Sequence, residues 1–136
     1  MGFIKIYLLS FVVFMSIDCI WLGFIAKNLY REQIGFLMAA QFRIVPAILF
    51  YTIYLFGLVY FVIEPSLRSS SFSGLMIGGA IFGFVCYATY DLTNLSTLKD
   101  WPIKIVFIDL AWGTLLSVTT SAICYSIGTH WKNYFN

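Results

Sequence analysis

The stretch that decides the fold is residues 74–94, GLMIGGAIFGFVCYATYDLTN, which carries no charged side chain before Asp91. An α-helix needs roughly 20 predominantly apolar residues to cross the hydrocarbon core of a bilayer. The stretch is therefore long enough for one membrane span. It also ends in polar residues, which raises the question of what those residues do at a membrane edge.

Three further apolar runs occupy about residues 3–26, 44–63 and 103–127. The 136 residues are 61% apolar and only 10% charged, with a mean hydropathy of +0.90. Soluble domains are closer to half apolar and a quarter charged, so this composition excludes an ordinary soluble globule. Helices satisfy their own backbone polar groups in lipid. We therefore predict a single all-α integral membrane domain over residues 1–136, a bundle of four transmembrane helices.

Two connections between these runs carry structural signals. In residues 27–43 the side chains of Leu29, Gln33, Phe36, Leu37 and Ala40 would share one face of a helix. This pattern is compatible with a short interfacial helix after the first span or with an irregular loop. Residues 64–71 contain a proline and several serines, a composition that predicts a turn ending the second span.

The charges predict an orientation in the membrane. Lys and Arg number 8 against 6 for Asp and Glu, a near balance that argues against nucleic-acid binding. Four spans place both termini on one side. The first and third loops carry five cations, and the other side carries three. The five are Lys27, Arg31, Arg43, Lys99 and Lys104, and the three are Lys5, Arg68 and Lys132. The positive-inside tendency therefore predicts cytoplasmic first and third loops.

Three aspartates lie inside the apolar runs, where a charged side chain is unfavourable. Asp18, Asp91 and Asp109 each fall a few residues from the membrane edge formed by the first and third loops, so they share one half of the bilayer. An unpaired Asp at the centre of a span costs roughly 2.5 to 3.5 kcal/mol on insertion scales. We expect these carboxyl groups to face the inside of the bundle and to form a polar site.

Helical spacing selects the neighbours of these aspartates. At 3.6 residues per turn, two glycines and the polar end of the third run form one stripe. The stripe comprises Gly79, Gly83, Tyr87, Tyr90, Asp91 and Asn94. Arg43 begins the second span at the same edge and is the best counter-ion candidate. The predicted binding residues are Asp18, Trp21, Arg43, Tyr87, Tyr90, Asp91, Asn94, Asp109 and Trp112.

Four motifs carry a family resemblance across nearly the whole chain. They are Asp18–Gly23 (DCIWLG), Tyr87–Asn94 (YATYDLTN), Trp101-Pro102 and Asp109–Trp112 (DLAW). In this order and size they resemble the small bacterial membrane family catalogued as domain of unknown function number 2177. The resemblance implies a four-span protein of the bacterial inner membrane, and it implies no particular activity.

Three kinds of function remain open. A pocket built on the aspartates would bind a small ligand, a lipid or a cation, and such a protein could be a small transporter. The carboxylate oxygens of the aspartates would suit magnesium or calcium better than zinc. The sequence has no His or Cys cluster that indicates a metal site, and it indicates no cofactor. In the second reading the protein is a membrane enzyme acting on a lipid-like substrate, with Asp91 and Asp109 as acid and base. In the third it is a structural or accessory subunit.

A second glycine spacing concerns assembly. Gly74 and Gly78 lie four residues apart on the opposite face of the third span from the polar stripe. Small residues at this spacing let two helices approach closely. The motif predicts either a homodimer contact or a contact within the chain.

Overall fold

The computed structural model describes residues 1–135, with side chains up to Trp131, and over this range the chain is helical without strands. This confirms the predicted all-α class. The helical segments are α1 (Phe3–Ile20), η1 (Trp21–Ile25), α2 (Lys27–Ile34), η2 (Gly35–Leu37), α3 (Ile44–Leu58), η3 (Val59–Ile63), α4 (Glu64–Ser69), α5 (Phe72–Thr97) and α6 (Ile103–Phe135).

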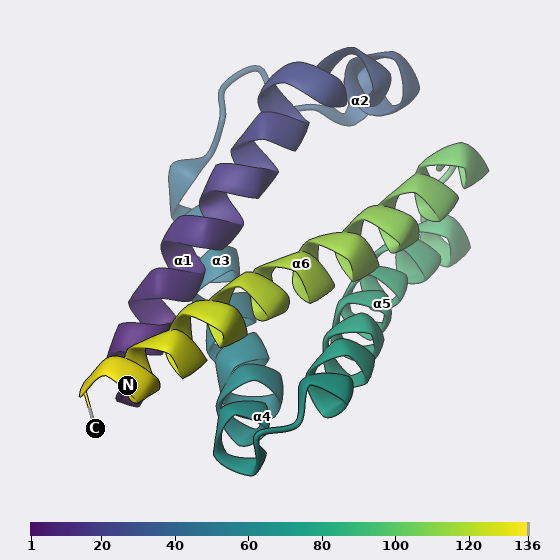
Figure 1. Cartoon of the computed structure of the whole chain (residues 1–136). Coiled ribbons are helices and arrows are strands. Elements are labelled where there is room, and N and C mark those ends of the chain that lie inside the picture. The colour runs from purple at the N-terminus through teal and green to yellow at the C-terminus, as the bar shows by residue number, and fades with distance from the viewer. Residues whose placement is uncertain (136) are drawn as a thin grey trace.

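Four continuous helical stretches are long and apolar enough to cross a membrane: Phe3–Ile25, Ile44–Ser69, Phe72–Thr97 and Ile103–Trp131. The predicted four-span bundle is thus confirmed. The start of α1 and the end of α6 lie together at the end of the bundle far from α2 (Figure 1). The side chain of Lys132, one of the cations used to predict the orientation, lies outside the described residues, and the sidedness of the loops stays a prediction.

Helices α5 and α6 pack so closely that glycine is required where they meet. A Cβ atom on Gly83 would meet the backbone carbonyl oxygen of Gly113 and would lie 2.6 Å from the Ser117 hydroxyl oxygen. Gly79 and Gly83 are both buried, as the stripe on the third run predicts. On α6 the facing residues are also small or polar and buried, including Ser117 and Ser121. Within the described residues, α5 and α6 are therefore the most closely packed pair of helices.

The second glycine spacing, Gly74 and Gly78, faces other residues of the same chain. A Cβ atom on Gly78 would lie 3.4 Å from a methyl carbon of Val62 in η3. The backbone N–H of Gly74 donates to the hydroxyl of Ser71, which caps the first turn of α5 at 3.0 Å. At Gly78 the structure therefore shows the intramolecular one of the two predicted contacts.

The second span does not end at Pro65, so the predicted turn over residues 64–71 is wrong for most of its length. Helix α4 carries Pro65 in its first turn and continues to Ser69, and a left-handed Ser70 ends it. A proline is tolerated in a first helical turn because its missing N–H is not needed there. The wider π-helical turn η3 ends at Ile63, and α4 begins at the next residue, so Pro65 falls in the first turn of a new α-helical segment.

The first loop contains a short helix, α2, so the helical one of the two alternatives is found, and its place at the membrane interface stays a prediction. The residues on α2 that face the bundle are Leu29, Tyr30 and Ile34, which pack on a buried cluster at the start of α6. That cluster comprises Trp101, Ile105 and Val106. Phe36 and Leu37, which the sequence pattern placed on the same face as Leu29, are exposed instead. The helix ends at Ile34 and a tighter turn follows, so the expected face does not continue.

Candidate functional site

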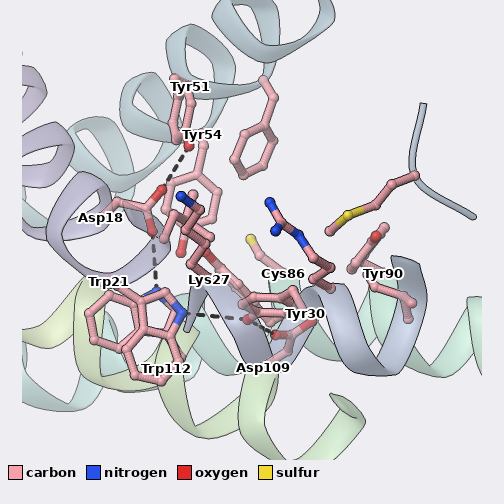
Figure 2. Close-up of a pocket in the computed structure, with 16 residues that line it drawn as sticks. Asp18, Trp21, Lys27, Tyr30, Tyr51, Tyr54, Cys86, Tyr90, Asp109 and Trp112 are labelled. Atoms are coloured by element: carbon pink, nitrogen blue, oxygen red, sulfur yellow. Dashed lines mark hydrogen bonds between the residues drawn. The ribbon is translucent and has the colours of Figure 1, made fainter. Parts of the chain in front are cut away.

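A cavity of about 670 Å³ lies beneath α2, between the upper part of α1 and helices α3, α5 and α6. It is partly open to the surroundings of the protein, and most of its wall is aromatic or aliphatic (Figure 2). The residues that line it are Asp18, Trp21, Leu22, Lys27, Tyr30, Arg31, Ile34, Met38, Phe50, Tyr51, Tyr54, Cys86, Tyr87, Tyr90, Asp109 and Trp112. Its volume falls within the roughly 300–1,000 Å³ typical of ligand pockets.

Asp18 joins three helices at one side of this cavity. Its carboxyl group accepts a hydrogen bond of 2.7 Å from the Tyr51 hydroxyl on α3 and one of 3.2 Å from the Trp112 indole on α6 (Figure 2). Asp18 lies in a membrane span, and its side chain is buried inside the bundle. Both of its oxygens therefore have a neutral donor, which is what a buried carboxylate requires.

Two stacked indoles form the neighbouring wall. The rings of Trp21 and Trp112 lie 4.3 Å apart between centroids and are nearly parallel, at 10°. Trp21 begins the π-helical turn η1, in which the backbone N–H of Ala26 donates to the Trp21 carbonyl oxygen five residues earlier, at 2.8 Å. π-Helical turns are rare and often occur at functional sites. Here the turn carries the side chain that completes the stack.

Tyr30 fastens α2 over the cavity. Its hydroxyl donates a hydrogen bond to the Asp109 carboxyl group on α6, and the Trp21 indole donates to the Tyr30 oxygen at 3.5 Å. Burial raises the pKa of the Tyr30 phenol above its ordinary value, and the hydrogen bond to Asp109 raises it further. The phenol therefore stays protonated near neutral pH and keeps its role as donor.

The deep end of the cavity is formed by tyrosines held against α6. The Tyr54 hydroxyl lies 2.5 Å from the Ser117 hydroxyl, and Tyr54 is only 5% exposed. The Tyr87 ring covers Gly113 so closely that a side chain at that glycine would overlap it. Cys86, half-buried on the same helix as Tyr87, also lines the cavity.

Asp91 lies behind the wall rather than in it. It is fully buried, and no donor among the described residues forms a hydrogen bond with either of its carboxyl oxygens. The carboxyl group of Asp109 and the indole of Trp101 are its polar neighbours.

Six of the nine predicted binding residues line the cavity: Asp18, Trp21, Tyr87, Tyr90, Asp109 and Trp112. Asp91 and Asn94 lie on α5 outside the lining. Arg43 is exposed where α3 begins and forms no ion pair with an aspartate in the described part of the chain. The expected counter-ion is thus not found, because neutral Tyr and Trp donors surround Asp18 and Asp109 instead.

Sequence reasoning missed the contribution of α2 and of the two tyrosines on α3. Lys27, Tyr30, Arg31 and Ile34 all line the cavity and are spaced 0, 3, 4 and 7 residues apart. This spacing places them on one face of a helix. The pattern was present in the sequence, but Lys27 and Arg31 were used there only to predict the orientation in the membrane.

The fold and the site define a four-span membrane protein with a buried polar cluster beside an aromatic cavity. A family model described as "Predicted membrane protein (DUF2177)" matches residues 3–126, and the chain belongs to this family. No curated protein and no solved structure matches the chain.

Proposed function

We propose that the cavity binds a membrane-embedded amphiphile, a lipid or lipid-like molecule. The observation that carries the proposal is the cavity beneath α2, whose wall is mainly aromatic and aliphatic and carries a few polar groups, among them Asp18, Tyr30 and Asp109. Ligand pockets of this kind combine an apolar wall with a few polar groups that orient the ligand.

The rim of the cavity supports entry from the bilayer. Leu22, Met38 and Phe50 line the cavity and are also 44%, 50% and 47% exposed. The apolar lining therefore continues onto the outer surface of the protein. A chain that extends from the cavity would stay in contact with lipid and would not meet water.

The cation alternative has less support. Among the residues with described side chains, no three His, Cys, Asp or Glu side chains come together as a metal-binding group. A hard cation needs six or more oxygen ligands, from the protein or from water. The oxygens of Asp18 already accept hydrogen bonds from Tyr51 and Trp112, so they are poorly placed to replace those ligands.

One observation favours catalysis as a second candidate. The Asp109 carboxyl group faces the cavity with Tyr30 bonded to it and Asp91 behind it, an arrangement that could move a proton at a bound substrate. Only Asp109 of the two carboxyl groups would touch the substrate. The test is the lipid composition of membranes that contain the wild type or Asp109→Asn. Identical compositions would refute a lipid-modifying activity.

The site has a proposed place in the cell. The family resemblance points to the inner membrane of a bacterium, and the distribution of Lys and Arg points to cytoplasmic first and third loops. The cavity would then open in the cytoplasmic leaflet, since α2 belongs to the first loop. C-terminal fusions test this orientation: alkaline phosphatase should be active and a green fluorescent protein dark. The opposite pattern would refute it.

Ligand retention tests the proposed function directly. Cys86 lines the cavity and Cys19 is exposed outside it, so Cys86→Phe and Cys19→Phe form a matched pair. After purification in mild detergent, native mass spectrometry should show a lipid adduct on the wild type and on Cys19→Phe, and its loss on Cys86→Phe. Circular dichroism should show all three folded. Equal adducts on all three, or none on the wild type, would refute a lipid in this cavity.

A further inference from the structure

One face of α2 places two cations over the cavity. Lys27 and Arg31 are one helical turn apart, and both line the cavity together with Tyr30 and Ile34. Figure 2 shows Lys27 and Tyr30 on the cavity wall together with Asp18 and Asp109. The rest of α2's contact with the bundle consists of the packing of Leu29, Tyr30 and Ile34 and the hydrogen bonds of the Tyr30 hydroxyl. The two cations are therefore presented to the cavity by a helix that other contacts hold in place.

Neither cation has an acidic partner. In the part of the chain with described side chains, neither Lys27 nor Arg31 forms an ion pair, and neither side chain makes a hydrogen bond. The acids on the cavity wall, Asp18 and Asp109, accept hydrogen bonds from tyrosine and tryptophan and from neither of these cations. Like charges four residues apart on a helix repel each other, and an anion bound between them relieves this repulsion.

We infer that the ligand of the cavity carries a phosphate headgroup, which Lys27 and Arg31 hold while the aromatic wall takes the acyl chain. This inference rests on the proposed function and adds the class of lipid. A guanidinium presents parallel donors that match phosphate oxygens, and an ammonium acts as a second point charge. Basic pockets near the membrane surface are typical sites for anionic headgroups.

The size and the opening of the cavity agree with a headgroup held by Lys27 and Arg31 and an acyl chain on the aromatic wall. The cavity holds about 670 Å³ and its apolar rim is exposed at Phe50 and Leu22, so the remaining chain can continue into the bilayer. The cations lie at the end of the cavity that α2 covers. An amphiphile with its headgroup under α2 and its chain along Trp21 and Trp112 satisfies both ends of the site.

The test compares lipids that differ only in the headgroup. Purified protein in a non-ionic detergent is titrated with phosphatidylglycerol, with diacylglycerol of the same acyl chains, and with glycerol phosphate, and binding is followed by native mass spectrometry. The wild type should bind phosphatidylglycerol at least about tenfold more tightly than diacylglycerol. Glycerol phosphate should bind weakly, because it has no chain for the apolar wall.

The variants locate the effect. Lys27→Gln and Arg31→Gln should each weaken phosphatidylglycerol binding by about tenfold and leave diacylglycerol binding unchanged, which also shows that they are folded. Lys104→Gln is the control, since Lys104 is an exposed cation at the nearby start of α6 that does not line the cavity. It should bind both lipids as the wild type does.

Four results would overturn the inference. Equal affinity of the wild type for the two lipids would refute phosphate recognition and leave the proposed function standing. A Lys27→Gln, Arg31→Gln double variant that keeps the preference would refute the role of these residues. If the wild type binds neither lipid, the proposed function fails together with the inference. Strong binding of glycerol phosphate alone would mean that the ligand is a soluble phosphate rather than a lipid.

Discussion

The hydrogen bond between Tyr51 and Asp18 gives a stability prediction that can be worked from the structure. It measures 2.7 Å, joins α3 to α1 at the cavity, and its acceptor is a buried carboxyl group. Hydrogen bonds to charged groups contribute about 1.5–3 kcal/mol in soluble proteins. Those measured within membranes average only about 0.6 kcal/mol, with a maximum of about 1.7 kcal/mol. The short distance and the buried carboxyl acceptor place this bond in the upper part of the membrane range, at about 1–1.5 kcal/mol.

The perturbation is a double-mutant cycle of Asp18→Ala and Tyr51→Phe. Asp18→Ala alone should destabilise the protein by about 2–4 kcal/mol, because the Trp112 indole also loses its acceptor. Tyr51→Phe alone removes one bond and should cost less. The double variant should be less destabilised than the sum of the single variants by the coupling of about 1–1.5 kcal/mol. Unfolding by sodium dodecyl sulfate in mixed micelles, followed by circular dichroism, measures all four free energies.

Tyr7→Phe supplies the control cycle. The Tyr7 hydroxyl also joins α1 to α3, through the Thr52 carbonyl oxygen at 3.1 Å, but it makes no hydrogen bond with Asp18. Paired with Asp18→Ala it should be additive within about 0.5 kcal/mol. A coupling between Asp18 and Tyr51 no larger than that in the control cycle would refute the view that Asp18 ties the two helices together.

Three further predictions concern the helix contacts around the cavity. Gly83→Ala should destabilise the protein by about 1–2 kcal/mol, because the new methyl group meets the α6 backbone. Gly78→Ala should not lower the free energy of unfolding in the same assay. Equal effects of the two substitutions would contradict the close packing of α5 and α6 at Gly83. The folded-state pKa of Tyr30 is raised, so the free energy of unfolding should fall as the pH rises above about 10, where an unfolded tyrosine ionises. Tyr30→Phe should make that fall smaller, and an unchanged pH profile would count against the buried phenol. A cycle of Trp21→Leu and Trp112→Leu should show a coupling of about 0.5–1.5 kcal/mol from the stacked rings, and additive effects would argue against the stack.

Much of the fold could be predicted because it depends on composition and period. The four spans follow from the length of the apolar runs, and the buried glycine stripe of α5 follows from its helical spacing. The end of the second span could not be predicted in the same way. Whether Pro65 stops a helix depends on the π-helical turn before it, and a single sequence shows no signal for that turn.

The site was predicted in part for a similar reason. Asp18 and Asp109 stand out because an acid in a span is unfavourable without a partner, and both lie on the cavity wall. The partners of these carboxyl groups could not be deduced from the sequence. A cation such as Arg43 and a neutral donor such as Tyr51 can each form a hydrogen bond with a carboxyl group, and the sequence does not distinguish them. For Asp109 the partner is Tyr30 on α2. The amphipathic pattern of α2 marks a helix but does not show which face covers the bundle.

The most direct test of the account is contact between a lipid chain and Tyr54. This ring lines the cavity and is only 5% exposed, so lipid in the surrounding bilayer cannot reach it. In nuclear magnetic resonance spectra of the protein in lipid nanodiscs, the account predicts nuclear Overhauser contacts between acyl methylene protons and the Tyr54 ring, which Cys86→Phe abolishes. Phe61, which is 69% exposed, should show such contacts in both proteins. Lipid contacts at Phe61 with none at Tyr54 in the wild type would contradict the central claim that the cavity holds a lipid.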